Sequence, residues 1–229
     1  MTVGSSINYS TLIASSATDG SIANWLNHSS IANSADTIVA EAESYIYRDL
    51  RHWQMITSTT GTMTANPVNV ANPVATITLP ADYLEDKVLW ITGVNAAQLK
   101  RKTMEEVIAM WGYDGAGFRI VQQPYFYFSD QDFIQFDSPP DQAYPYLLYY
   151  YQQPASLAST AGGTNFLTQF YPRLLRCACC MLAAEFMKDA GQGDYDRTYW
   201  EQQAGLELAK AQMESDRQQR SQDIGMILN

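Results

Sequence analysis

The spacing of apolar residues changes character twice along this chain of 229 residues, and no other feature constrains its fold as strongly. Residues 33–53 carry apolar side chains every three or four positions, as on one face of an α-helix. Residues 57–153 instead hold short alternating or continuous apolar runs between turn residues, which predict strands. Helical spacing then returns. We predict an α+β protein in which residues 1–56 and 154–229 form a helical core with a C-terminal tail, and residues 57–153 form a β-rich insertion.

The predicted core is a helical bundle, and the antiparallel β insertion falls between its first long helix and its C-terminal helix pair. The first long helix is NSADTIVAEAESYIYRDLRHW, in which Asn33 can cap the N-terminus and Asp36 complements the helix dipole. A short helix is expected before it, around SIANWLNH. The C-terminal pair begins near Phe170, is interrupted by GQGD, and continues from about Tyr195 to Arg220.

The insertion is predicted from five apolar segments. VATITLP alternates, VLWITGV and YLLYYYQ are continuous, and YFYF and FIQF flank the polar connection SDQD. Thr103 and Glu106 can form a capping box for a short helix over VIAMW. The turn-rich stretch at residues 57–73 is expected to be irregular.

All three cysteines lie within RCACC at residues 176–180. On a helix, Cys177 and Cys180 share one face, while Cys179 points about 200° away from Cys177. A structural zinc site needs four ligands, usually from two separated pairs, and no second pair is present. We therefore expect no metal and no cofactor, and we interpret the cysteines as reduced, small, buried side chains. Residues 174–187 are apolar on most sides, so this helix is expected to be covered from several directions, with a subunit interface as one source of cover.

The charge balance argues against a protein that grips nucleic acid by its phosphates. The chain carries 24 acidic and 14 basic side chains, a net charge of −10. Its one basic triplet, at residues 100–102, is interpreted as a solvated strand end. Four aspartates crowd one hairpin but lack the glycine and the terminal glutamate of a calcium loop, so we expect a solvated acidic hairpin. These are Asp130, Asp132, Asp137 and Asp141.

The sequence lacks the usual signatures of an enzyme or a membrane protein. No nucleophile elbow, glycine-rich phosphate loop or HExxH motif is present. No run of eighteen apolar residues predicts a membrane span, and no signal peptide is expected. Clustered cysteines without disulfide-like spacing fit a reducing cytoplasm. We therefore predict a protein that is not an enzyme and does not enter a membrane.

Four blocks of the sequence, taken in order, resemble a known family. They are IVAEAESYIYRDLRHWQM, TITLPADYLEDKVLWI, FIQFDSPPDQAYPYLLYYYQQPASL, and NFLTQFYPRLLRCACCMLAAEFMKD with the later YWEQQAGLELAKA. The matching positions are Ala42, Glu43, Ile46, Arg48, Leu50, Arg51, Pro80, Asp82 and Tyr83. Order and spacing carry the likeness, which covers most of residues 35–212. The chain resembles the head-to-tail adaptor, or head completion (connector), proteins of short-tailed bacteriophages. The first 33 residues and the cysteine cluster depart from the family's pattern.

This resemblance implies a structural protein of the virion. Such adaptors form a ring, typically of twelve subunits, between the portal protein and the tail, at the neck. The ring extends the DNA channel, through which DNA passes without specific binding, and offers a docking surface to the tail nozzle, hub or fibre proteins. The protein would be made in the host cytoplasm. Closed rings need heterologous interfaces, which fits a widely apolar helix and a chain with fifteen tyrosines and five tryptophans.

Three alternatives remain at this point. One is a tail-tube or neck component, and another is a free-standing cytoplasmic interaction module. The third is a virion-associated peptidoglycan hydrolase, which would need a pair of carboxylates. The neighbouring Glu105 and Glu106 suit that role poorly, because adjacent helical residues diverge by about 100°.

Two groups of residues are predicted to contact the portal or a neighbouring subunit. Arg48 and Arg51, three positions apart on the first long helix, are expected to form ion pairs within or between subunits. The C-terminal stretch ESDRQQRSQDIGMILN is polar until an apolar tip of Met226, Ile227 and Leu228. Because Gly225 weakens a helix there, we predict a mobile tail that docks this tip on the portal or on a neighbour.

Overall fold

The structure, a computed structural model, describes residues 7–14, 21–68, 73–93, 95–160, 163–189 and 196–227. It contains both helices and a seven-stranded sheet, so the predicted α+β class is confirmed. The chain divides into two compact units. The helical unit comprises Met1–Gln54 and Pro154–Asn229, and the β unit comprises Met55–Gln153.

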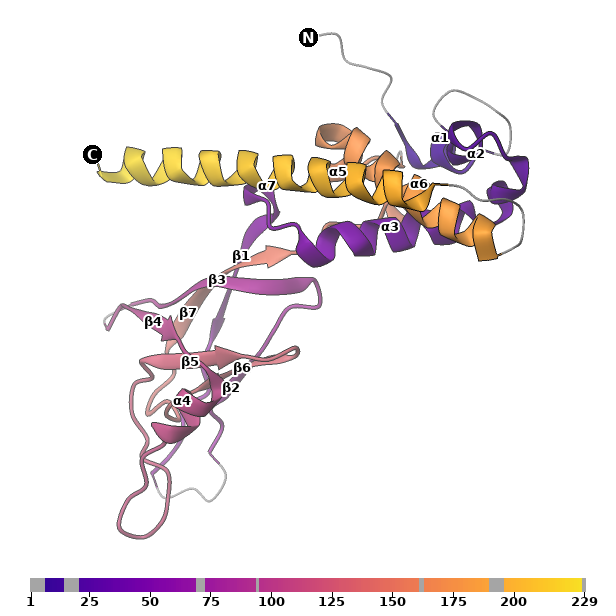
Figure 1. Ribbon diagram of the computed structural model, residues 1–229. Helices are drawn as coiled ribbons and strands as arrows, with labels where there is room; N and C mark the ends of the chain where they lie inside the picture. The colour runs from indigo at the N-terminus through magenta and orange to yellow at the C-terminus, as the bar shows by residue number, and fades with distance from the viewer. Residues whose placement is uncertain are drawn as a thin grey trace. The chain divides into compact units, whose positions relative to one another are not determined.

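The helices follow the order of Figure 1, with η marking 3₁₀ turns. They are α1 (Tyr9–Leu12), α2 (Ile22–Trp25), η1 (Ser29–Ser34), α3 (Ala35–Asp49), η2 (Trp53–Met55), α4 (Met104–Ala109, in the β unit), η3 (Leu157–Ser159), α5 (Phe166–Phe170), α6 (Pro172–Asp189) and α7 (Arg197–Ile227).

Helix α6 is the centre of the helical unit. It packs along both α3 and α7 (Figure 1). Its first residue is Pro172, where the missing backbone N–H costs nothing. Its buried positions are mostly small or flexible: Leu174, Leu175, Cys177, Ala178, Cys179, Cys180, Met181, Ala183, Ala184 and Met187. The predicted cover from several directions is therefore confirmed, and α3 and α7 supply a large part of it.

The structure corrects the predicted start of α3 and the predicted end of α7. Asn33 is not the cap of α3, because η1 precedes the helix and Ser34 occupies the cap position without a side-chain hydrogen bond. The long helix predicted to begin near Phe170 is confirmed, because α6 begins at Pro172. A capping box at Asn165 starts a separate short helix, α5, just before it. The last helix does not end at Arg220. Helix α7 continues through Gly225 to Ile227, since one glycine costs only about 1 kcal/mol of helix stability.

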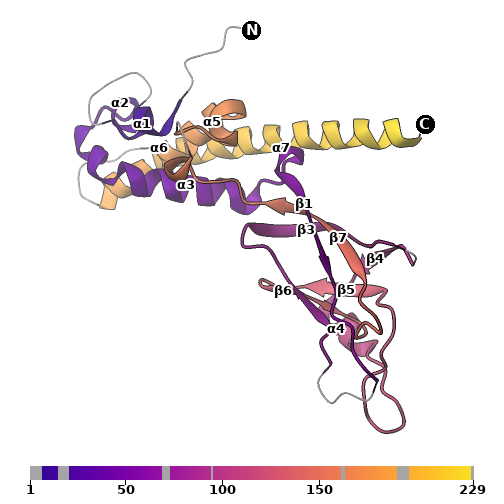
Figure 2. The same ribbon diagram turned by 180° about the vertical axis from the view of Figure 1, so that it is seen from behind.

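The β unit is one mixed sheet with the strand order β1-β7-β3-β4-β5-β6-β2. Figure 2 shows strands of this sheet from behind. The strands are β1 (Ile56–Thr62), β2 (Thr76–Thr78), β3 (Tyr83–Ile91), β4 (Ala97–Arg101), β5 (Phe126–Ser129), β6 (Phe133–Phe136) and β7 (Pro145–Gln152). Its core contains Met63, Ile77, Leu79, Leu89, Ile91, Leu99, Tyr127, Ile134, Phe136, Tyr144, Leu148 and Tyr150. All neighbouring pairs are antiparallel except β4 and β5, which are parallel, so the predicted antiparallel insertion is corrected at that one pair.

The sheet also contains a strand that the sequence did not predict. Residues 57–62 were expected to be irregular, yet they belong to β1 and pair along the tyrosine-rich β7. The threonines of β1 suit a strand because they are β-branched. Gly61 lies opposite Tyr146, and an added Cβ on Gly61 would come within 2.6 Å of the tyrosine ring carbon that bears the hydroxyl. The aromatic side chain thus covers the glycine.

Other predictions for this unit are confirmed or extended. VATITLP and YLLYYYQ contain the strands β2 and β7, as predicted. The strand predicted at VLWITGV is part of β3, which begins earlier, at Tyr83, and ends at Ile91. Helix α4 has the capping box formed by Thr103 and Glu106. None of the described helices combines the length and the apolar character that a membrane crossing requires.

Candidate interaction surfaces and buried polar sites

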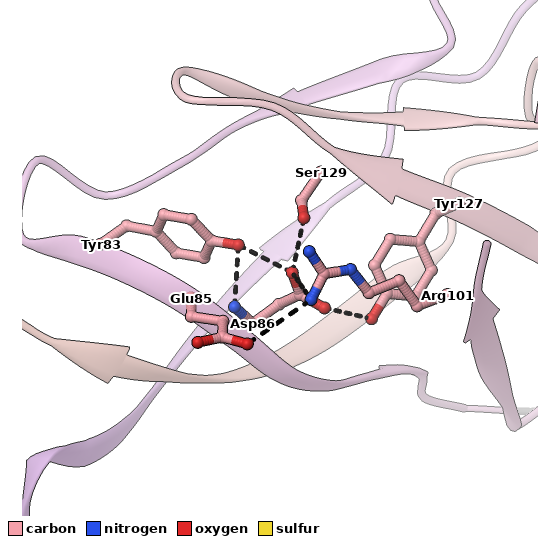
Figure 3. A network of polar contacts seen from close by, with 6 residues as sticks. All are labelled: Tyr83, Glu85, Asp86, Arg101, Tyr127 and Ser129. Atoms are coloured by element: carbon pink, nitrogen blue, oxygen red, sulfur yellow. Dashed lines mark hydrogen bonds and ion pairs between the residues drawn. The ribbon is translucent and has the colours of Figure 1, made fainter. Parts of the chain in front are cut away.

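Asp86 is the centre of the densest polar network in the β unit (Figure 3). Its carboxylate is almost fully buried and accepts hydrogen bonds from three hydroxyl groups. Tyr83 and Ser129 donate to Oδ1 at 2.8 and 2.6 Å, and Tyr127 donates to Oδ2 at 2.7 Å. The backbone N–H of Asp86 donates to the Tyr83 hydroxyl at 2.8 Å. These contacts join β3 to β5 by side chains, although the two strands are not neighbours in the sheet.

A cation completes this network. Arg101 Nη1, at the end of β4, lies 3.5 Å from Asp86 Oδ1 and 3.8 Å from Glu85 Oε1. Burial by itself would raise the pKa of Asp86, but the hydroxyl donors and the nearby guanidinium outweigh it, so the pKa lies below its usual value. Burial and the same carboxylate raise the pKa of Tyr83 to about 12. Asp86 is therefore an ionised structural anchor and is unsuited to act as a general acid.

A shallow groove of about 400 Å³ opens beside the network. It is lined by Tyr83, Leu84, Glu85, Arg101, Ser129, Asp130 and Gln131. The predicted basic triplet is not a free patch, because Arg101 contacts Glu85 and Asp86, and Lys102 pairs with Glu106 at 3.1 Å. Glu106 is also held by the α4 capping box, so it is not available as one of a pair of hydrolytic carboxylates.

The acidic hairpin is only partly solvated. Asp137 is buried, contrary to the prediction, and its Oδ1 accepts from the backbone N–H groups of Tyr125 and Phe126 at 3.1 and 3.2 Å. Burial raises its pKa despite these bonds. Asp130, Asp132 and Asp141 are exposed. Among the described residues, no group of three or more His, Cys, Asp and Glu side chains is placed to hold a metal ion.

Glu43 is the corresponding buried carboxylate of the helical unit. From α3 it accepts the backbone N–H of Leu157 at 3.1 Å and the side-chain amide of Asn165 at 2.6 Å. Asn165 also donates to the Tyr47 hydroxyl at 3.3 Å. Burial raises the pKa of Glu43, and the two donors offset this only in part. Glu43 thus fixes the chain to α3 just after it returns from the β unit.

A second set of contacts fixes the chain where it leaves the helical unit. The backbone N–H of Trp53 donates to Ser215 Oγ at 2.9 Å, and Gln212 exchanges hydrogen bonds with the backbone of Arg51. Buried His52 lies 2.9 Å from the Tyr171 hydroxyl, which also donates to Glu214 at 3.1 Å. Burial lowers the pKa of His52, with the charge of Glu214 acting in the opposite direction. Helix α7 therefore anchors the end of the first segment.

The cysteines are buried within the helical unit and form no disulfide. Burial raises the pKa of all three thiols, most strongly that of the fully buried Cys179. Their interpretation as small buried side chains is confirmed. A thiol held in its neutral form in an apolar site is a poor metal ligand and a poor nucleophile.

Arg48 and Arg51 do not share a helix face, because α3 ends at Asp49 and Arg51 lies beyond it. Arg48 is exposed and contacts Asp49 at 3.3 Å. Arg51 donates from Nη1 to the carbonyl oxygens of Tyr47 and Leu50, both at 3.0 Å, and so satisfies the end of α3. Met226 and Ile227 lie in the last turn of α7, and Leu228 lies outside the described residues.

Helix α7 buries one face and carries exposed apolar side chains on the opposite face. Ala204, Ala211 and Ser215 are fully buried on one side. Leu206 and Met213, seven residues apart, lie on the other side and are 56% and 54% exposed. Tyr199, another seven residues earlier, is 49% exposed. We call Tyr199, Leu206 and Met213 the outer stripe of α7. An exposed apolar stripe of this kind indicates an interaction surface.

At the start of the outer stripe lies a pocket of about 290 Å³, which we call the arginine pocket. It is lined by Trp25, Arg173, Arg176, Cys177, Tyr199, Trp200 and Gln203. The Arg176 guanidinium lies 5.3 Å from the centre of the Trp25 ring, and the rings of Tyr199 and Trp200 meet edge to face at 5.1 Å. Arg173 Nε pairs with Glu207 at 3.4 Å. The pocket thus combines aromatic walls with two cations.

The buried polar groups hold segments of the chain together, and the exposed side chains of α7 offer a surface for other proteins. Comparison with known proteins agrees with such a structural role. A family model described as SU10 adaptor protein matches residues 7–225, which is nearly the whole chain. The chain belongs to the SU10 adaptor family. A search of curated proteins found no match.

Membership of the SU10 adaptor family confirms the resemblance to phage head-to-tail adaptors. This SU10 adaptor is therefore a structural phage protein of the head–tail region. Sequence reasoning missed that the carboxylates of Glu43 and Asp86 are buried. Asp86 lies between Glu85 and Lys87 in the sequence, so nothing local marked it as buried. Two of its hydroxyl partners lie on β5, about forty residues away. Nothing in the sequence indicated that the outer stripe of α7 would be left uncovered.

Proposed function

We propose that this protein forms a ring adaptor between the portal and the tail of a short-tailed phage, extends the DNA channel and offers the surface on which the tail docks. The family match over residues 7–225 carries this proposal. The exposed side chains of the outer stripe support it, because a ring subunit must leave apolar surface for its neighbours. We propose twelve copies, the number that the resemblance implies.

The proposed channel suits the charge of the chain. With a net charge of −10, the protein offers few cations to phosphates, so DNA can pass without being held. Tight, salt-sensitive binding of duplex DNA by the assembled ring would contradict this part of the proposal.

The proposed contact with the portal uses the end of α7. Met226, Ile227 and Leu228 form an apolar tip, and burying three such side chains contributes about 4 to 8 kcal/mol before ordering costs. Because Met226 and Ile227 already belong to a helix, fewer backbone torsions must be ordered than for an unstructured tether. Arg48, which is exposed on α3, is a second proposed contact, and Arg51 supports it by closing the end of that helix.

Mixing the full chain with isolated portal rings tests the assembly. We expect one ring of subunits on one face of each portal, visible by cryo-electron microscopy. We also expect the free chain to be monomeric or weakly associated by light scattering, because the portal raises the local subunit concentration. A chain that joins purified tail tubes but not portals would be a tail-tube or neck component. Clearing of a cell-wall zymogram would instead indicate a hydrolase.

A truncation after Gln222 tests the anchor. It removes the apolar tip but leaves Ser215, which α7 uses to hold the first segment. We expect portal binding to weaken at least tenfold, while a control that lacks only Asn229 binds normally. Undiminished binding of the truncated chain would exclude the tip as the anchor.

A further inference from the structure

The arginine pocket holds one cation that lacks a charge partner among the described residues. Arg173 pairs with Glu207 Oε1, which also accepts from Lys210 at 2.7 Å. No described carboxylate lies within ion-pair distance of Arg176, whose guanidinium contacts the face of Trp25. Arg176 is also half-buried, so water screens it less than a surface arginine. In a chain with a net charge of −10, such a position favours an incoming carboxylate.

The surroundings of Arg176 define what else the incoming group must carry. Trp25, Trp200 and Tyr199 form the walls, and the outer stripe continues from Tyr199 to Leu206 and Met213. A free inorganic anion would leave these surfaces wet. A carboxylate flanked by large apolar side chains would cover them. The complementary surface is therefore acidic at one point and apolar around it.

The β unit of the same protein carries a surface with this chemistry. On α4, Met104 and Ile108 lie one turn apart and are 53% and 37% exposed, and Met110 directly after the helix is 42% exposed. Between them, Glu105 is exposed and makes no hydrogen bond or ion pair with any described residue. We call Met104, Glu105, Ile108 and Met110 the α4 tip. Its neighbour Glu106, by contrast, is held by Thr103 and Lys102.

We propose that the arginine pocket and outer stripe of one copy receive the α4 tip of a second copy, with Glu105 pairing with Arg176. This inference rests on the proposed ring. The two surfaces differ, so the contact is heterologous: each copy gives one surface and receives the other, which is the arrangement that closes a ring. The apolar side chains supply contact area, and the single charge pair selects the register.

A charge exchange tests the pairing. Arg176→Glu and Glu105→Arg, each alone, place like charges together, and each is expected to weaken ring assembly on portals at least tenfold. The double variant Arg176→Glu/Glu105→Arg restores opposite charges at every interface and is expected to recover most of the assembly. Arg217→Glu and Glu41→Arg, at exposed sites on α7 and α3, serve as matched controls and are expected to assemble normally. Circular dichroism of each variant establishes that it is folded.

Cross-linking gives a second readout. With the three native thiols buried, Tyr199→Cys/Met104→Cys offers the only two exposed thiols among the described residues. A heterologous contact produces a ladder of cross-linked multimers on the portal, whereas either single variant produces none. Rings that form normally from both charge-reversed single variants, without a ladder, would overturn this inference and leave the proposed function intact. Failure of the wild-type chain to form any ring on portals would instead overturn the proposed function.

Discussion

Glu43 in the helical unit and Asp86 in the β unit are buried to a similar degree, with 4% and 6% of their surface exposed, yet their pKa values move in opposite directions. Glu43 receives one backbone amide and one side-chain amide. Asp86 receives three hydroxyl groups and lies near the Arg101 guanidinium. Burial depth alone therefore does not decide in which direction the pKa of a carboxylate moves. The number of donors and a nearby cation do.

The same comparison separates the ways in which the two units are held together. The helical unit relies on close packing of small side chains around α6, and hydrogen bonds hold the chain where it leaves this unit and where it returns. The β unit contains a charged anchor that joins strands across the sheet. Replacing a buried side chain by one of different polarity is thus expected to change the free energy of unfolding by different amounts in the two units.

The largest expected effect is that of removing Asp86. Asp86→Ala leaves the buried Tyr127 hydroxyl without its acceptor and Arg101 with only the more distant Glu85, so we expect a loss of about 3 to 5 kcal/mol in the free energy of unfolding. Glu43→Ala removes no partner of a cation and is expected to cost about 2 to 3 kcal/mol. Urea denaturation measures both. A larger loss of unfolding free energy for Glu43→Ala than for Asp86→Ala would contradict this comparison of the two carboxylates.

A smaller effect is expected from a hydroxyl group in the helical core. Cys179→Ser places a hydroxyl where the cysteine is fully buried, and we expect a loss of about 2 kcal/mol relative to Cys179→Ala. The native thiols are expected to resist a thiol reagent until the protein unfolds. Rapid labelling of the folded protein would contradict the close packing around α6.

The pH dependence of stability separates Glu43 from Asp86 further, because the two carboxylates contribute slopes of opposite sign to the free energy of unfolding as a function of pH. The raised pKa of Glu43 gives a contribution to stability that is complete below about pH 4.5 and is lost as the pH rises through the folded-state pKa. The lowered pKa of Asp86 gives a contribution that is complete above its ordinary pKa of 3.8 and is lost as the pH falls. Each unit of pKa difference corresponds to about 1.4 kcal/mol.

The variants Glu43→Gln and Asp86→Asn isolate these slopes. The stability of the wild type relative to Glu43→Gln is expected to fall as the pH rises above about 4.5, and that relative to Asp86→Asn to fall as the pH drops below about 4. Denaturant midpoints across this range provide the measurement. Slopes of the same sign for both variants would contradict the assignment of Asp86 as the ionised anchor.

The smallest expected effect compares two glycines with positive φ. Gly163 in the helical unit has φ of +61°, and an added Cβ would lie 2.8 Å from Tyr9 Cβ. Gly117 in the β unit has φ of +84° with open space around it. Gly163→Ala is expected to cost about 2 kcal/mol and Gly117→Ala about 1 kcal/mol. Equal losses in thermal unfolding would show that backbone strain alone, without the contact to Tyr9, sets both values.

The sequence by itself determined those features that depend on neighbours within a few residues. Pro172 starts α6, Thr103 and Glu106 cap α4, and the spacing of small and apolar residues around Cys179 marks a helix that is covered on most sides. Such signals depend on helix geometry and on local hydrogen bonds, which one segment contains completely. They were sufficient for the α+β class and for the resemblance to phage adaptors.

Only the tertiary structure decided those features whose partners lie far along the chain. The threonine-rich β1 becomes a strand because β7, about ninety residues later, supplies its hydrogen bonds, and β4 runs parallel to β5. Glu43 meets Leu157 across 114 residues, so no local pattern distinguishes it from an exposed glutamate. Apolar spacing likewise places Leu206 and Ala211 in one helix but does not say which face α6 will cover. Long-range packing decides this, because only there does one apolar face gain a partner while the other stays exposed.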